Sequence, residues 1–151
     1  MGEETFMPCT PKSVVTILNS LNINLEGMDV VVIGRSNIVG KPAGALLLKE
    51  NCTVTMCHSK TKNLREVCKR SDILVVAIGK AKFIDDSFVK EGAIVIDVGT
   101  NSVQGKITGD VDFDKVIDKA SFVTPVPGGV GALTTTLLMK NACEAIEKYE
   151  D

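Results

Sequence analysis

The segment 28–49, MDVVVIGRSNIVGKPAGALLLK, limits the possible folds more than any other part of the chain. Its run 30–33 is apolar without polar alternation, which is typical of a strand buried on both faces of a parallel sheet. A loop at 34–40 follows, and Pro42 indicates the first turn of a helix. Such a strand, turn and helix N-terminus favour a bound anion, because free N–H groups and the helix dipole point at it.

The turn matches the dinucleotide fingerprint G-x-G-x-x-G imperfectly. Ser36 holds the second glycine position, and Gly40 comes one residue late. Many α/β proteins that bind no nucleotide also have a turn of small residues between a strand and a helix. The turn alone is therefore a modest signal for a dinucleotide.

Buried strands and helices alternate along the rest of the chain. The patterns predict strands over 30–33, 53–57, 72–79, 93–98 and 121–124, helices over 10–21, 41–50, 61–70 and 132–149, and a hairpin-like excursion between Gly105 and Gly109. Thr10 and Thr61 are predicted to cap the first and third helices, and Asp112 a short helix after it. This alternation predicts an α/β fold, a Rossmann-type doubly wound domain with a mainly parallel sheet and helices on both faces.

Composition restricts the class of protein. With 151 residues, 44% of them hydrophobic, the chain is expected to form one domain over 10–151, after a linker stub at 1–9. A formal net charge of −2 argues against nucleic acid or an anionic membrane as the main partner. The five cysteines form no C-x-x-C pair, which fits reduced thiols in the cytoplasm. No apolar run is long enough to cross a bilayer.

Five unusual segments follow the predicted strands. They are 34–40, 58–61, 79–82, 99–101 and 125–131. Ligands of such sheets gather at the carboxyl ends of the strands, so we expect all five segments to line one crevice.

The second of these segments bears on the choice of cofactor. NAD-binding domains have an Asp or Glu about 20 residues past the glycines, which accepts from the ribose hydroxyls. Here Ser59 and Lys60 occupy that region, and the nearest downstream acid is Glu66. With Arg35 in the first loop, these donors favour a ribose 2′-phosphate, and hence NADP. The alternative is that Arg35 and Lys60 are solvated surface charges, and the pattern alone leaves both open.

Three other features have ordinary explanations. His58 is the only histidine, and a lone histidine at a strand end is more often structural than catalytic. Asp110, Asp112 and Asp114 resemble the start of a calcium loop, but its glycine and glutamate are lacking, and we expect no metal site. The loop 125–131 holds two prolines and three glycines, which suits a stiff wall against a flat ring; the alternative is a tight strand-to-helix connection.

Six linked motifs resemble one family. VVVIGRSNIVGKP, TVTMCHSKTKN, DILVVAIGK, VIDVGTN, GDVDF and TPVPGGVG occur in the order and at the spacing of the cofactor domain of bifunctional methylenetetrahydrofolate dehydrogenase/methenyltetrahydrofolate cyclohydrolase. The similarity extends over about 6–149.

The resemblance implies an NADP site and a substrate loop. The implied cofactor-binding residues are Gly34, Arg35, Ser36, Ile38, Val39, His58, Ser59, Lys60, Thr61, Ile78, Gly79, Gly99, Thr100 and Asn101. The loop of Pro127, Gly128, Gly129, Val130 and Gly131 resembles the family's wall between nicotinamide and folate. The family continues this loop with proline, whereas this chain has Ala132. The shape of the folate side is therefore an open question.

A larger departure concerns the catalytic groups. The family's folate-binding lobe, about the first half of its chain, has no counterpart in this sequence. That lobe supplies a Tyr-x-x-x-Lys pair, and the one tyrosine here, Tyr149, is followed by only two residues. We therefore expect no catalytic residue in this chain, folate binding only together with that lobe, and no activity of the chain alone.

The resemblance also implies a cellular setting and an assembly. The family works in cytoplasmic one-carbon metabolism, which serves purine biosynthesis, and it is generally dimeric. Its terminal helices join the two lobes. Some apolar residues among Val14, Leu18, Leu133 and Leu137 are therefore expected to be uncovered here and to promote a homodimer.

Two other functions compete with this interpretation. One is a stand-alone, non-catalytic NADP-binding or interaction module. The other is the NADP domain of a different amino- or keto-acid dehydrogenase. The linked CHSKT and TPVPGGVG segments argue against the second.

Overall fold

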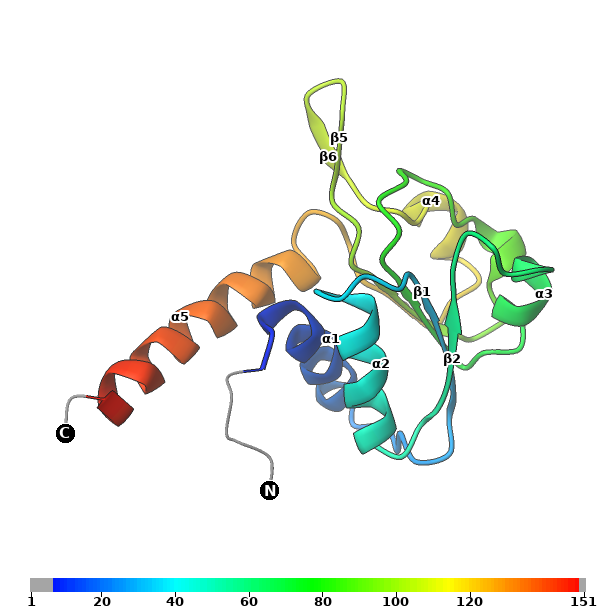
Figure 1. Cartoon of the computed structure of the whole chain (residues 1–151). Coiled ribbons are helices and arrows are strands. Elements are labelled where there is room, and N and C mark those ends of the chain that lie inside the picture. Colours follow the sequence, from blue (N-terminus) through cyan, green and yellow to red (C-terminus); the bar gives the residue numbers. More distant parts are fainter. Residues whose placement is uncertain (1–6, 150–151) are drawn as a thin grey trace.

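The computed structural model describes residues 7–149. Figure 1 shows a parallel sheet between two layers of helices, with a hairpin and a long helix projecting from it. The main sheet contains five strands in the order β2-β1-β3-β4-β7. Its strands are β1 (Asp29–Ile33), β2 (Thr53–Cys57), β3 (Ile73–Val76), β4 (Ile94–Asp97) and β7 (Phe122–Val123), and the hairpin consists of β5 (Asn101–Val103) and β6 (Lys106–Thr108). The helices are α1 (Cys9–Ser20), α2 (Gly40–Lys49), α3 (Leu64–Cys68), the 3-10 helix η1 (Asp86–Phe88), α4 (Phe113–Val116) and α5 (Val130–Tyr149).

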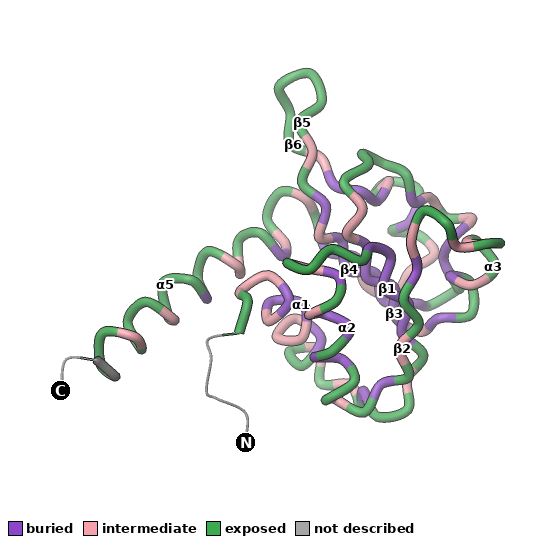
Figure 2. Tube along the Cα trace, in the orientation of Figure 1, coloured by how far each residue is buried: buried purple, intermediate pink, exposed green. Residues whose placement is uncertain are grey.

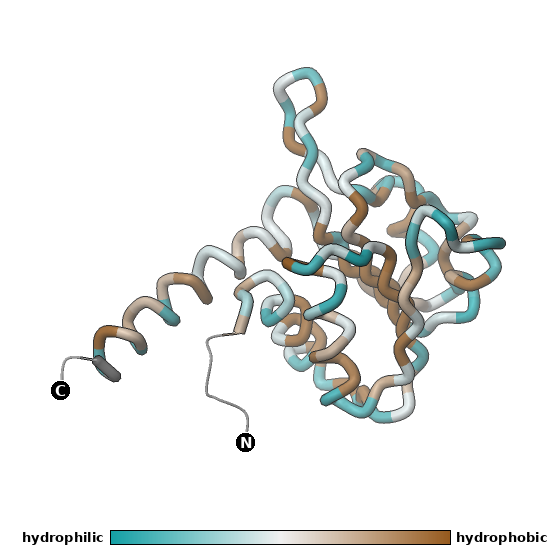
Figure 3. The backbone as a smooth tube through the Cα atoms, viewed as in Figure 1, coloured by the Kyte–Doolittle hydropathy of each residue, from teal (hydrophilic) through white to brown (hydrophobic). Residues whose placement is uncertain are grey.

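The apolar strands bury both of their faces, as predicted. Successive side chains of a strand point to opposite faces. Val30 and Val32 of β1 accordingly pack in one core with residues of α1 and α2. Val31 and Ile33 pack in a second core with residues of α3, η1 and α4. The tube in Figure 3 is brown along these strands. The structure confirms the doubly wound α/β fold.

The strand order also determines where a ligand can lie. The chain passes from β1 to the edge strand β2 and returns to β3 on the other side of β1. This reversal creates a crevice at the carboxyl ends of β1 and β3, the usual ligand position in such sheets. The edge position of β2 also leaves Met56 partly exposed.

Helix α1 packs against α5, which corrects one expectation. The hydroxyls of Ser13 and Thr134 lie 3.1 Å apart in a hydrogen bond between the two helices. Val14 and Leu18 are fully buried, and Leu137 is 8% exposed. The prediction that these side chains are uncovered is wrong, because the two helices and the sheet cover one another.

Other side chains of α5 are exposed instead. They are Leu138 at 60%, Met139 at 67% and Ile146 at 55%. Figure 2 shows that the later turns of α5 extend away from the sheet and are largely exposed. The exposed apolar side chains of α5 are therefore these three, and not Leu137.

The predicted caps of the helices need correction. Helix α1 begins at Cys9, with Pro8 at its N-cap, so Thr10 is no cap and the predicted linker boundary falls inside the first turn. Residues 1–6 of that linker lie outside the described residues. Helix α3 starts after Asn63, and the Thr61 hydroxyl instead accepts from the His58 N–H. Asp112 stands at the N-cap of α4, but its side chain makes no cap bond.

The hairpin also differs in detail. The predicted excursion exists, but Gly105 lies in the two-residue turn between β5 and β6 and does not bracket it. Gln104 and Gly105 both have positive φ, which is the requirement of a tight hairpin turn. Among residues 7–149, no helix combines the length and apolarity needed to cross a membrane.

Candidate functional site

The unusual segments at the carboxyl ends of the strands line two cavities. Segments after β1, β2 and β3 line the first, and segments after β4 and β7 line the second. One shared crevice was expected, and the structure instead distributes these segments over two cavities.

The first cavity has a volume of about 350 Å³. Its lining residues are Ile33, Gly34, Arg35, His58, Ser59, Thr61, Leu64, Ala77, Ile78, Lys80 and Phe83. Arg35 and Lys80 bring two cations to this lining, and it contains no acidic residue. Leu64 and Phe83 add an apolar wall. The cavity therefore suits a ligand that has both an anionic group and a flat apolar part.

Two glycines bring the first loop close to the sheet and to α2. A Cβ at Gly34, where φ is +125°, would lie 2.2 Å from the Ala77 carbonyl oxygen. A Cβ at Gly40 would lie 2.2 Å from the Gly34 carbonyl oxygen. Gly40 thus permits the close helix–strand packing that the last glycine of the fingerprint permits, despite its shifted position.

Ser36 changes the predicted role of the loop N–H groups. Its Oγ accepts from the N–H of Val39 at 3.1 Å and of Gly40 at 3.3 Å. The Ser36 hydroxyl therefore occupies two of the donors that were expected to face an anion. Ser36 supports the helix start and does not line the first cavity, and Ile38 and Val39 also lie outside it.

The segment after β2 forms a closed turn. The His58 N–H donates to Thr61 Oγ1 at 2.8 Å, and the Lys60 N–H donates to His58 Nδ1 at 3.2 Å. His58 thus accepts through Nδ1, so its neutral ring carries the proton on Nε2. The turn places Ser59 on the lining of the first cavity, whereas Lys60 lies outside it. These contacts are compatible with the structural role that the sequence favoured, and His58 itself also lines the first cavity.

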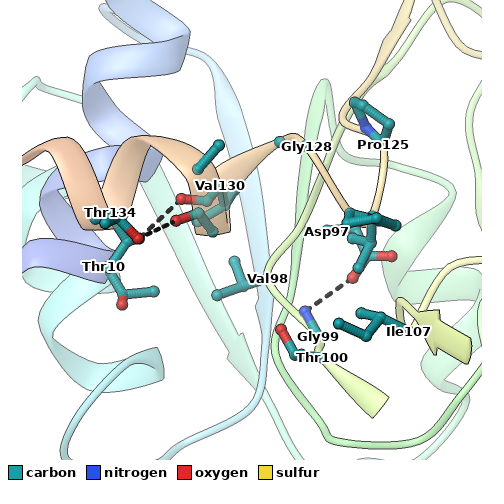
Figure 4. A pocket seen from close by; sticks show the side chains of 16 residues that line it. Thr10, Asp97, Val98, Gly99, Thr100, Ile107, Pro125, Gly128, Val130 and Thr134 are labelled. Atoms are coloured by element: carbon teal, nitrogen blue, oxygen red, sulfur yellow. Dashed lines mark hydrogen bonds between the residues drawn. The ribbon is translucent and has the colours of Figure 1, made fainter. Parts of the chain in front are cut away.

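The second cavity is larger, with a volume of about 550 Å³. All five residues of the predicted substrate loop, Pro127 to Gly131, line it together with Gly99 and Thr100. Figure 4 shows this loop and the start of α5 on one side, and the end of β4 with Ile107 of the hairpin on the other. Thr10 of α1 and Thr134 of α5 add hydroxyl groups to the wall.

Two buried aspartates lie between the cavities. Asp97 accepts from the N–H groups of Gly99 at 2.9 Å, Asp110 at 3.1 Å and Val111 at 2.9 Å. Burial raises the pKa of Asp97 to about 6, although these three bonds favour the charged form. Asp110 is completely buried, and its carboxylate holds the segment after β3.

Asp97 and Asp110 were not recognised as site residues from the sequence. In the sequence, Asp110 only resembles the start of a calcium loop whose other ligands are lacking. Its burial could not be predicted, because neighbouring residues in the chain do not show whether an aspartate is buried or exposed. Other lining residues were missed too, namely Leu64 and Phe83 in the first cavity and Thr10, Ile107 and Thr134 in the second, while Lys80 lies in the predicted segment 79–82 but was not named as a cofactor residue. Six predicted cofactor residues line neither of these cavities: Ser36, Ile38, Val39, Lys60, Gly79 and Asn101.

The described residues contain no group of three or more His, Cys, Asp or Glu side chains that could hold a metal ion. The donors of the first cavity are instead a guanidinium, an ammonium, hydroxyls and backbone N–H groups. Such donors bind phosphate and hydroxyl groups.

Comparison with known families matches residues 8–150 to the NAD(P)-binding domain of tetrahydrofolate dehydrogenase/cyclohydrolase. Among curated relatives, the bifunctional protein FolD of Clostridium botulinum (strain Alaska E43 / Type E3) is 74% identical over the whole chain, which covers 54% of that relative. FolD of Clostridium acetobutylicum is 61% identical over 97% of this chain and 52% of its own length. The chain spans about half the length of the curated relatives it matches.

Solved structures give the same result. The bifunctional enzyme FolD of Campylobacter jejuni has a TM-score of 0.93 and 46% identity, covering 97% of this chain and 52% of its own. The Trypanosoma brucei methylenetetrahydrofolate dehydrogenase-cyclohydrolase, solved with NADP and an inhibitor, has a TM-score of 0.89 and 38% identity. That match covers 95% of this chain and 51% of the other.

Proposed function

Because this chain belongs to the tetrahydrofolate dehydrogenase/cyclohydrolase family and matches its NAD(P)-binding domain, we propose that its first cavity binds the adenosine end of NADP. The observation that carries this proposal is the pairing of Arg35 and Ser59 on a lining without an acidic residue. A ribose 2′-phosphate is doubly charged and needs such donors, whereas the ribose hydroxyls of NAD are usually held by a carboxylate.

The geometry of the first loop fits a dinucleotide. Gly34 and Gly40 let strand, loop and helix approach closely, so the N-terminus of α2 faces the carboxyl edge of the sheet. There the helix dipole favours the cofactor's phosphates. Because Ser36 already bonds to Val39 and Gly40, the phosphates would meet the exposed loop residues before these two N–H groups.

The second cavity extends the site toward the reacting end of the cofactor. When bound, NADP supplies hydride chemistry through its nicotinamide ring. The chain's own contribution is orientation, and Pro127 to Gly131 provide a wall of restricted backbone beside that ring. Thr10 and Thr134 lie on the same lining. The Thr134 hydroxyl already donates to the Val130 carbonyl at 2.8 Å and bonds to Ser13, so the Thr10 hydroxyl is the one that could meet a polar group of whatever faces the ring.

For the whole protein, of which this chain spans about half, we propose both activities of the family. Hydride passes from methylenetetrahydrofolate to NADP⁺, and the methenyl product is then hydrolysed. Folate binding requires the family's other lobe. We further propose that the protein is cytoplasmic and homodimeric, and that its products serve purine biosynthesis, as the family resemblance implies.

Calorimetric titration with NADP and NAD tests the proposal. A hydrogen bond to a charged group is worth about 1.5–3 kcal/mol, so Arg35→Ala should weaken NADP binding roughly 10- to 100-fold. NAD has no phosphate at that position, so its affinity should change little. Ser59→Ala should act in the same direction but more weakly.

Arg70→Ala is the matched control, because Arg70 is exposed and lines neither cavity. It should leave both affinities unchanged. Equal weakening of NAD and NADP by Arg35→Ala would show that Arg35 supports the loop and does not meet the 2′-phosphate.

A further inference from the structure

The carboxylate of Asp110 fills a ring of backbone donors. Three consecutive N–H groups after β3 converge on it: Ile78 to Oδ2 at 2.7 Å, Gly79 to Oδ2 at 2.9 Å and Lys80 to Oδ1 at 2.8 Å. Successive N–H groups in this arrangement form an anion-binding nest. Here the anion belongs to the protein itself, and it comes from a position 30 to 32 residues further along the chain.

Asp110 is in turn held from the side of the second cavity. Asn101 Nδ2 donates to Asp110 Oδ1 at 2.9 Å and to the Thr108 carbonyl at 3.3 Å. The Asp110 N–H donates to Asp97 Oδ1 at 3.1 Å. A Cβ at Gly99 would lie 2.1 Å from Asp110 Cγ, so the carboxyl group rests directly on this glycine.

The two sets of contacts connect the cavities. Ile78 and Lys80 belong to the lining of the first cavity, and Gly99 and Asp97 to that of the second. Asp110 lies on neither lining, yet it bonds to residues of both. Its side chain is completely buried, so solvent does not compete for these bonds.

We propose that Asp110 is a positioning residue of the cofactor site, whose carboxylate fills the nest at 78–80 and so holds the wall on which the dinucleotide lies. With the nest filled, a phosphate of the cofactor cannot bind there and is directed to the loop after β1. This inference rests on the proposed binding of NADP by the first cavity.

Truncation followed by anion rescue tests the proposal. Asp110→Ala removes the carboxylate and leaves three N–H groups facing a small space. NADP affinity of the 151-residue chain should then fall about 10-fold or more, since charge-assisted bonds are lost. Added sodium formate brings a carboxylate into that space and should restore most of the affinity. Formamide has the same size without the charge, and it should restore nothing at ionic strength held constant with sodium chloride.

Two further variants keep the test decisive. Asp110→Asn preserves the size of the side chain but places an NH₂ group against two donors, either those of Lys80 and Asn101 at the Oδ1 position or those of Ile78 and Gly79 at the Oδ2 position. It should therefore weaken NADP binding even if the alanine variant fails to fold. Asp112→Asn in the same GDVDF motif is the control. Asp112 pairs with Lys82 and Lys115 and touches no residue of the nest, so NADP affinity should be unchanged.

The outcomes separate this inference from the proposed function. If the wild-type chain binds NADP and both Asp110 variants bind it equally well, Asp110 is not a positioning residue. Equal effects of formate and formamide would also overturn the inference. If the wild-type chain does not bind NADP, the proposed function fails. The binding of a carboxylate by the nest is then tested on the cofactor-free Asp110→Ala chain. Formate should raise the melting temperature of this variant, and formamide should not.

Discussion

Two glycines and two aspartates pack reciprocally at the end of β4. A Cβ at Gly99 would lie 2.1 Å from Asp110 Cγ, and a Cβ at Gly109 would lie 1.9 Å from Asp97 Oδ2. Each carboxyl group therefore occupies the space that a side chain would need on the opposite glycine. Both carboxylates can reach their backbone N–H donors only because Gly99 and Gly109 have no side chain. A side chain at either glycine would therefore displace a buried carboxylate from its hydrogen bonds.

A glycine substitution tests the close packing of the first loop. Gly40→Ala should destabilise the chain by about 2 kcal/mol or more, because the new methyl group would meet the Gly34 carbonyl, which is backbone and cannot turn away. Gly131→Ala is the matched control in the first turn of α5, since nothing lies within 4 Å of its added Cβ. Its effect should stay within about 1 kcal/mol. Urea unfolding measures both, and equal effects would contradict the role of Gly40.

Asp97 should impose a particular pH dependence on stability. Its pKa is about 6 in the folded chain and near the ordinary 3.8 when unfolded, so the folded state holds the proton more tightly. Its contribution is therefore most favourable below pH 4 and is lost as the pH rises from about 4 to 6. The negative charge of Asp110 adds to this upward shift, whereas the Asp110 N–H, which donates to Asp97 Oδ1, opposes it.

Comparison of the wild type with Asp97→Asn isolates this effect. The free energy of unfolding of the wild type should fall relative to that of the variant between pH 4 and 6, by on the order of 3 kcal/mol for a shift of about two pKa units. The pKa of Asp72 is shifted in the opposite direction, because the Lys90 ammonium, 2.6 Å away, lowers it. This contribution is the same in the wild type and the variant, so it cancels in the difference between their free energies of unfolding. Parallel pH curves for the two proteins would contradict the raised pKa of Asp97.

At the scale of elements, α5 combines a packed and an unpacked face. Leu137 and Thr134 face α1, while Leu138, Ala142 and Ile146 follow one another at intervals of four residues on an exposed face. Met139 and Cys143 lie beside them and are also exposed. An apolar stripe of this kind on an extended helix favours association with a partner.

This stripe predicts self-association of the chain. Leu138→Glu combined with Ile146→Glu should shift sedimentation toward monomer at high micromolar concentration. The reason is that association would bury two carboxylates without partners, which costs free energy. Lys140→Glu is the control, since Lys140 is exposed and, two residues from both Leu138 and Ala142, lies on the other side of α5, so the association should be unchanged. A wild type that sediments as a monomer, or a control that dissociates equally, would count against the stripe as the contact.

At the scale of the whole molecule, cofactor binding and catalysis should separate. The sequence has no Tyr-x-x-x-Lys, and the one acid on the second cavity, Asp97, is committed to three backbone bonds. The 151-residue chain should therefore bind NADP but form no NADPH from methylenetetrahydrofolate and hydrolyse no methenyl product. Absorbance assays of both steps check this, and steady turnover by the purified chain would refute it.

The sequence alone determined the layers and most of the ligand-facing loops. Unbroken apolar runs at 30–33, 73–76 and 94–96 are recognisable because a strand with two buried faces needs apolar residues at every position. The loops after these strands follow, since parallel strands all end at one edge. The loop at 34–40, the segment at 58–61 and the loop at 125–131 were located in this way, and residues of each line one of the two cavities.

Only the tertiary structure decided how these parts meet. Asp110 and Ile78 are 32 residues apart, and nothing local in the sequence shows that a carboxylate two residues after the hairpin fills the nest after β3. Likewise, the exposed face of α5 was misplaced because its packing partner α1 lies more than 100 residues away. Periodicity reports which residues can be buried together along one element. Contacts between distant elements depend on how the whole chain folds together, and they decide which of these loops line the same cavity.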